Sequence, residues 1–127
     1  MDEYTKLKET KDRMLASSIT ATWSYVSEQR DYHQPFEAAK AALADTFFGP
    51  PDTGAYSPSV QFTLYRMGAA ALRAAPALTA VTLNMPNIHY LPCDPVNTQG
   101  FENDVFVATS EPHGTIEATV EKSSAKL

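Results

Sequence analysis

The sequence predicts an α+β domain in which two helices cover one face of an antiparallel sheet. Residues 13–25 and 115–121 alternate between apolar and polar side chains, as strands with one buried face do. Two consecutive segments in the middle of the chain instead repeat their apolar residues at helical spacing. Helices that follow one another, with strands before and after them, are typical of α+β domains. A chain of 127 residues holds at most one ordinary domain.

The first expected strand, residues 13–25, has two faces of different chemistry. Its apolar face consists of Leu15, Ile19, Ala21, Trp23 and Tyr25. Its other face is mostly small and polar: Met14, Ala16, Ser18, Thr20, Thr22 and Ser24. A polar sheet face requires water or a lumen, which favours a barrel built from several copies. An open sheet also has edges that pair with other strands, so we expect an oligomer.

Both expected helices carry start and stop signals. The first covers residues 35–47, with its proline in the first position and the Gly-Pro-Pro of residues 49–51 as a stop. The second has Ser57 as N-cap and Pro58 as its first residue, and it ends before Pro76. Its apolar stripe comprises Val60, Leu64, Met67, Ala71 and Leu72. Three strands are expected after the helices: residues 78–85, 105–107 and 115–121.

Composition argues against several classes of protein. The net charge of −5 opposes a nucleic-acid partner and provides no basic patch for a membrane surface. No apolar run approaches the length of a membrane span. The one cysteine, Cys93, rules out an internal disulfide and is typical of a reducing compartment. Glycine-rich phosphate loops are absent, and nothing indicates a nucleotide cofactor.

The start of the second helix is the first candidate binding site. Helix N-termini leave backbone N–H groups free and carry a partial positive charge, so they bind anions and carbonyl oxygens. Gln61 adds a donor and an acceptor on one rigid amide, which suits the edge of a heterocycle. The simpler interpretation is a capped helix with a solvated glutamine.

Two further segments carry polar side chains that could bind a ligand or move a proton. Arg13 presents a planar fork that suits a carboxylate or a heterocyclic anion, although most lone arginines are surface residues. Asn87 and His89 follow the strand 78–85, where an amide can hold a small polar ligand and an imidazole can relay a proton. Their simpler interpretation is a loop asparagine and a surface histidine. His89 and Cys93 are too few ligands for a metal site, and we expect none.

Three motifs together resemble those of urate oxidase (uricase). They are "DEYTKLKETKDR", "FFGPPDTGAYSPSVQFTLY" and "LNMPNIHYLPCD", followed by the tail "SAKL". They occur in the order of that family and span nearly the whole chain, but they match only the family's C-terminal half. The resemblance implies a T-fold (tunnelling-fold) half-barrel that lacks its first strand, with four subunits closing a barrel around a tunnel. It also implies cofactor-free oxidation of urate by O2 to 5-hydroxyisourate and H2O2.

The resemblance assigns roles to six residues. In the family, an arginine and a glutamine grip urate from both sides, and they match Arg13 and Gln61. The valine before that glutamine contributes its backbone N–H and matches Val60. A leucine that lines the urate pocket matches Leu7, although this chain reads Thr-Lys-Leu there. The asparagine that holds the oxygen or water site and the histidine of the proton relay match Asn87 and His89.

Other parts of the family's site have no counterpart in this sequence. The catalytic lysine and threonine belong to the N-terminal half, and the phenylalanine that stacks on urate lies just before the "DEY" stretch. We therefore expect this chain to carry the urate-gripping half of the site and to need an N-terminal half or other subunits. Two alternatives remain: a non-catalytic purine-binding or barrel-assembly module, and a pterin enzyme of the T-fold. The latter anchors its heterocycle with a glutamate where this chain has Gln61.

The last residues, 122–127, are expected to form a flexible tail. Ala125, Lys126 and Leu127 keep the small residue, the cation and the leucine of the receptor-read peroxisomal signal. The tail therefore predicts a peroxisomal protein. A frayed polar end without a signal is the alternative.

Overall fold

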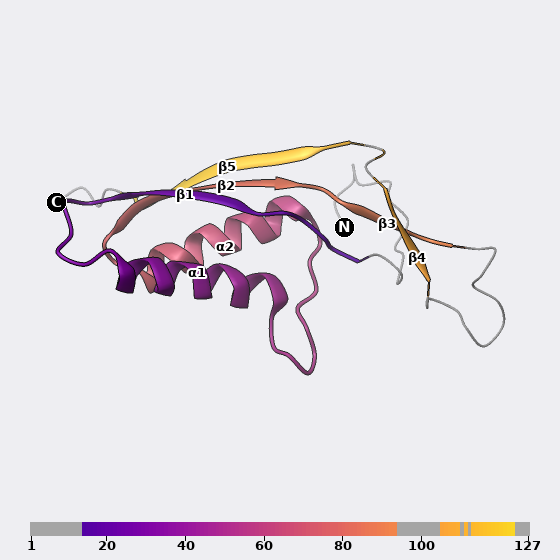
Figure 1. Ribbon diagram of the computed structural model, residues 1–127, viewed down its shortest axis with the longest axis horizontal. Coiled ribbons are helices and arrows are strands. Elements are labelled where there is room, and N and C mark those ends of the chain that lie inside the picture. The colour runs from indigo at the N-terminus through magenta and orange to yellow at the C-terminus, as the bar shows by residue number, and fades with distance from the viewer. Residues whose placement is uncertain (1–13, 94–104, 110, 112, 124–127) are drawn as a thin grey trace.

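The computed structural model describes residues 14–93, 105–109, 111 and 113–123. In this part of the chain, two helices lie against one side of an antiparallel sheet (Figure 1). The elements are β1 (Thr20–Tyr25), α1 (His33–Phe48), α2 (Val60–Ala74), β2 (Leu78–Pro86), β3 (His89–Pro92), β4 (Phe106–Thr109) and β5 (Thr115–Glu121). The predicted α+β class and the order of its helices are confirmed.

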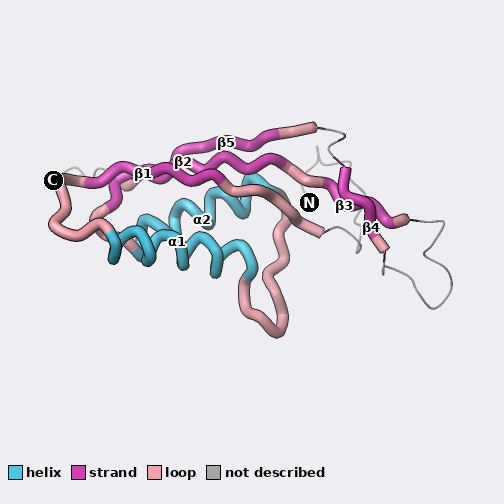
Figure 2. Tube along the Cα trace, viewed as in Figure 1, coloured by secondary structure: helices cyan, strands magenta, loops and turns pink. Residues whose placement is uncertain are grey.

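The larger sheet has the strand order β1-β2-β5, with both pairs antiparallel. β2 is the central strand, while β1 and β5 form the two edges of this described sheet. β3 and β4 pair separately as a two-stranded ladder beyond one end of the larger sheet (Figure 2). β3 was not expected as a strand, and β4 runs to Thr109 instead of ending at residue 107.

The core lies between the sheet and the helices. Side chains from α2 and β2 dominate it, and the largest that are fully buried are Leu64, Met67, Leu78, Leu83, Met85 and Val81. Burying an aliphatic side chain of this size contributes about 1.5–3 kcal/mol relative to leaving it exposed. β2 lies between β1 and β5 and packs against α2. This central position explains why its apolar side chains are the most completely buried.

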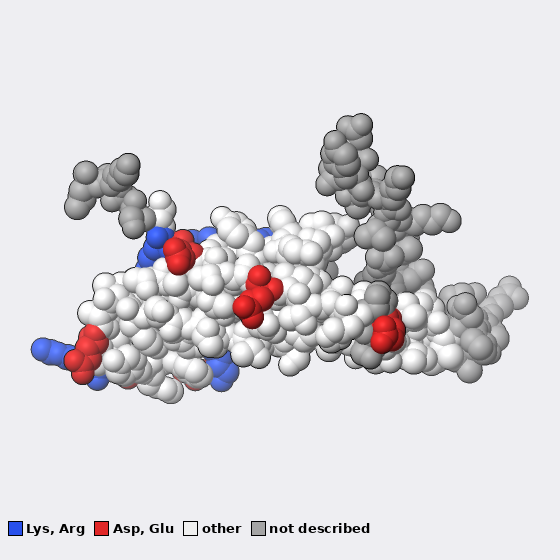
Figure 3. Space-filling model, turned by 90° about the horizontal axis from the view of Figure 1, so that it is seen from above, with Lys and Arg blue, Asp and Glu red and all other residues white. Residues whose placement is uncertain are grey.

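The opposite face of the sheet is polar, as the alternation in residues 13–25 and 115–121 predicts. Cross-strand rows join its side chains: the Thr82 and Thr119 hydroxyls are 2.7 Å apart, and the Asn84 amide donates to Glu117 at 2.8 Å. The view from above shows this side of the molecule, where acidic groups stand apart on a mostly uncharged surface (Figure 3). Most of its β1 and β5 side chains are exposed to solvent.

The first strand is shorter than expected, and a proline explains the difference. The ladder between β1 and β2 stops at the pair Thr20–Asn84. Continuing the same register would place Ser18 opposite Pro86, which has no N–H to donate. Pairing resumes two residues further along each strand, where the Ile88 N–H donates to the Ala16 carbonyl at 3.2 Å.

The first helix also begins earlier than expected. It starts at His33, whose N–H donates to the Asp31 carboxylate at 2.8 Å, so Pro35 is its third residue. Proline is tolerated there because the N–H groups of a first helical turn have no partner within the helix. The helix ends at Phe48, one residue later than expected and directly before the predicted stop at Gly49.

Gly49 turns the chain at the start of the loop that leads to α2. It has φ +69° and ψ −164°, a conformation that is essentially restricted to glycine. A Cβ at this position would lie 2.5 Å from the Ala55 Cβ and 2.8 Å from the Ala55 nitrogen. The absence of a side chain at Gly49 therefore lets Ala55 pack directly against the backbone of residue 49.

We predict that Gly49→Ala lowers the free energy of unfolding more than Gly54→Ala does. Gly54 also has a positive φ, +64°, but a Cβ there meets nothing within 4 Å. The Gly54 variant thus carries the cost of a positive φ without a close contact, about 1–2 kcal/mol. The Gly49 variant adds overpacking, about 1–3 kcal/mol more. Equilibrium denaturation measures both, and equal losses would show that the contact with Ala55 is unimportant.

Candidate functional site

The N-terminus of α2 differs from the expected start in one respect. Ser59, not Ser57, is the N-cap: its backbone is extended, and its Oγ accepts from the Phe62 N–H at 3.1 Å. Ser57 instead donates to the Ser59 carbonyl at 2.9 Å. Pro58 therefore precedes the helix. The sequence signal for the correct cap is the second serine of Ser-Pro-Ser, placed directly before the apolar stripe.

This shift places both candidate residues of the helix in its first turn. Val60 is the first helical residue and Gln61 the second. Their N–H groups have no acceptor within the helix, because the first four N–H groups of an α-helix never do. The Val60 side chain is buried at 6% exposure, which anchors the turn in the core, whereas Gln61 is exposed.

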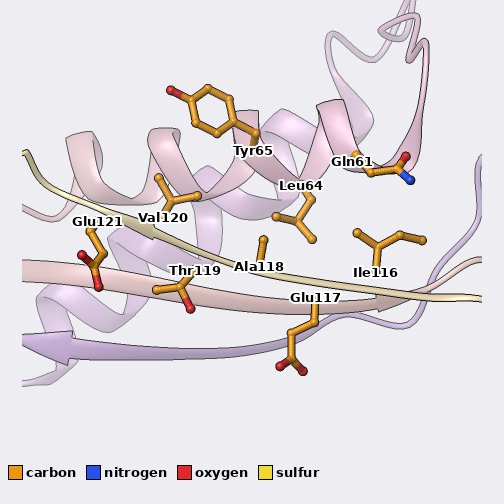
Figure 4. Close-up of a pocket in the computed structure, with 9 residues that line it drawn as sticks. All are labelled: Gln61, Leu64, Tyr65, Ile116, Glu117, Ala118, Thr119, Val120 and Glu121. Carbon is orange, nitrogen blue, oxygen red and sulfur yellow. The ribbon is translucent and has the colours of Figure 1, made fainter.

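A groove of about 390 Å³ begins at Gln61 and runs between α2 and β5. It is lined by Gln61, Leu64, Tyr65, Ile116, Glu117, Ala118, Thr119, Val120 and Glu121. Gln61 lies at one end, next to Ile116, while Glu117 and Thr119 point away from the helices (Figure 4). Sequence reasoning did not identify β5 as part of this groove, because alternation alone does not tell which strand lies beside α2.

Asn87 and His89 follow β2 at the same end of the sheet. Met85 pairs with Ile116 and Pro86 with Thr115, and the Asn87 N–H then donates to the Gly114 carbonyl at 2.8 Å. His89 opens β3 opposite Thr109. Both residues are half-buried. They do not line the groove, but strand pairing brings their segment to the end where Gln61 lies.

Arg13 and Leu7 lie outside the described residues. The pairing of Ala16 with Ile88 and the hydrogen bond from the Ser17 hydroxyl to the Pro86 carbonyl, 2.8 Å, fix the chain just after Arg13. This contact brings the beginning of the described chain to the end of the sheet that holds Asn87.

Metal and membrane features are both lacking in the described part of the chain. Within it, no group of three or more His, Cys, Asp or Glu side chains could hold a metal ion, and Cys93 is a half-buried free thiol. None of its helices is long and apolar enough to cross a membrane.

Comparisons with known proteins point to one family. The family model described as Uricase matches residues 1–117. Uricase-2 isozyme 2 of Glycine max is 45% identical and uricase of Arabidopsis thaliana 44% identical over 139 aligned positions; the alignments cover 99% of this chain and 45% of each relative. The chain thus spans about half the length of the curated relatives it matches.

Solved structures agree with the sequence matches. The uricase of Arthrobacter globiformis superimposes with a TM-score of 0.77 and 29% identity, over 100% of this chain and 43% of that one. A uricase from Bacillus fastidious gives a TM-score of 0.70 and 26% identity, over 95% and 37%. The expected T-fold half-barrel, with two helices on one face of an antiparallel sheet, is the fold of this chain.

Proposed function

This chain belongs to the uricase family, and we propose that it supplies the urate-gripping part of a urate oxidase site. The reaction oxidises urate with O2 and water to 5-hydroxyisourate and H2O2. The observation that carries the proposal is the first turn of α2, where Val60 and Gln61 stand at the end of the sheet that Asn87 reaches from β2. The comparisons support it, because the named relatives are uricases.

The start of α2 suits urate chemically. Urate is an anion at neutral pH, and a helix N-terminus favours negative charge. The Val60 N–H donates to an acceptor on the ring, while the Gln61 amide can both donate and accept along the same edge. Arg13 grips the opposite edge with its fork, and Leu7 lines the pocket. Contacts at both edges fix the ring in its plane, which orients it for attack by oxygen.

Asn87 and His89 serve the chemistry above the ring. The Asn87 amide holds dioxygen, and later peroxide or water, by hydrogen bonds. His89 passes protons within a relay whose base comes from elsewhere in the assembly. No cofactor or metal takes part in this scheme.

The partner of this chain is urate oxidase polypeptide itself. An N-terminal half or other subunits supply the base, and four subunits close the barrel. Two observations support assembly: the described sheet ends in the open edges β1 and β5, and its face away from the helices is polar. Open edges pair with further strands, and a polar face suits the lining of a water-filled tunnel.

We predict that Gln61→Leu weakens urate binding by the assembled enzyme roughly tenfold to a hundredfold. A hydrogen bond to a charged partner contributes about 1.5–3 kcal/mol. Gln34→Leu is the matched control, because Gln34 is the second residue of α1 just as Gln61 is of α2, and it is also exposed. The urate dissociation constant is measured without oxygen. Unchanged affinity in the Gln61 variant would remove that side chain from the site.

We predict that a polypeptide of these 127 residues alone does not oxidise urate at a useful rate. General base catalysis contributes about 10²–10⁴-fold and needs a base within hydrogen-bonding reach. The family draws that base from its N-terminal half. Oxygen uptake in aerated urate solution is the measurement, and adding the N-terminal half is the control that restores it. Turnover by the single polypeptide near that of an intact uricase would contradict the assignment of the base.

We predict that the tail directs a reporter to peroxisomes. Ala125, Lys126 and Leu127 match the character of the receptor-read signal, and confinement suits a reaction that releases H2O2. A fluorescent protein carrying residues 122–127 should become punctate and coincide with a peroxisomal marker. The same fusion without the last three residues should stay diffuse, and diffuse fluorescence of both would refute the signal.

A further inference from the structure

Thr63 stands out because it is polar yet buried, at 5% exposure, in the first turns of α2. Its hydroxyl has a partner: the Thr63 Oγ1 and the Ser57 Oγ are 2.6 Å apart. Burying a hydroxyl without a hydrogen-bond partner lowers the free energy of unfolding, so this bond offsets the cost of burying Thr63. Ser57 belongs to the loop, not to the helix, and the bond therefore joins two different segments.

Ser57, Ser59 and Thr63 form a closed network around the start of α2. Ser57 also donates to the Ser59 carbonyl at 2.9 Å, and the Thr63 N–H donates to that same carbonyl at 3.1 Å. Ser59 in turn caps the helix through Phe62. The other hydrogen bonds described within residues 49–59 are local, such as that from the Gly54 N–H to the Pro50 carbonyl at 2.7 Å. The Ser57–Thr63 contact thus ties the loop to the side of the helix.

Thr63 also lies close in the helix to the two proposed urate-binding groups, the Val60 N–H and the Gln61 amide. It lies three residues after Val60, and residues with this spacing share one helix face; both are buried. Gln61 lies between them on the exposed side. If the contact between Ser57 and Thr63 is lost, the Val60 N–H and the Gln61 amide remain present. The turn that carries them then lacks the side-chain hydrogen bond that joins the helix to the loop.

We propose that Ser57 and Thr63 are positioning residues that hold the first turn of α2 in the orientation required for urate. The inference rests on the proposed function. Neither residue touches urate in this scheme; each acts through the Val60 N–H and the Gln61 amide. Small errors in the placement of a substrate have large effects on rate, because orientation accounts for much of catalysis.

The test compares two substitutions at one position in the assembled enzyme. Thr63→Val keeps the volume and removes the hydroxyl, whereas Thr63→Ser keeps the hydroxyl and removes a methyl group. Thr63→Val should raise the urate KM roughly threefold to tenfold, the effect of one hydrogen bond, with a smaller change in kcat. Thr63→Ser should restore the KM even where it lowers thermal stability. If KM instead follows stability in both variants, Thr63 has only a packing role and the proposal fails.

A double-mutant cycle provides an independent readout. Ser57 is half-buried in a loop, so Ser57→Ala should fold even if Thr63→Val does not. Ser57→Ala should raise the KM at least as much as Thr63→Val does, because it also removes the hydrogen bond from Ser57 to the Ser59 carbonyl. The double variant should match Ser57→Ala, because the Thr63 substitution then has no further bond to remove. Additive effects would overturn the proposal. Failure of the unaltered enzyme to bind urate would instead refute the proposed function, which separates the two failures.

Discussion

The packing of α2 beneath β2 and β5 is the constraint on which the rest of the structure depends. Leu64 and Met67 of the helix are almost completely buried, as are Leu83 and Met85 of the strand. Gly68 makes the approach of β5 possible, since a Cβ there would lie 2.6 Å from a methyl group of Val120. A larger residue would push the edge strand outward and change the groove that α2 and β5 form.

This packing also decides where the polar groups of the site stand. Because α2 is held under the sheet along its length, its first turn emerges at the end where β5 begins and β2 ends (Figure 1). The cap by Ser59 and the loop contact through Ser57 then fix the turn itself. A rigid element thus carries the groups proposed to hold urate, which suits a site that must orient its substrate.

Much of this fold could be predicted from local pattern, and its departures have local physical causes. Alternation located β5 with its observed bounds, and the apolar stripe located α2. Pattern could not show that Pro86 would lie opposite Ser18 and interrupt the first ladder, because that depends on register between distant strands. The expected N-cap, Ser57, was wrong for another reason: Ser59, directly before the apolar stripe, was the better signal and was passed over in favour of the serine before proline. The roles of the six candidate site residues came from family motifs and remain expectations: Leu7, Arg13, Val60, Gln61, Asn87 and His89. Of these, Leu7 and Arg13 lie outside the described residues.

The central claim is that the first turn of α2 binds one edge of urate. A crystal structure of the assembled enzyme with urate, prepared without oxygen, tests it most directly. The account predicts a urate edge within hydrogen-bonding distance of the Val60 N–H and the Gln61 amide, with the Arg13 guanidinium on the opposite side of the ring. A urate ring bound away from α2, or an Arg13 side chain directed to the other face of the sheet, would contradict it.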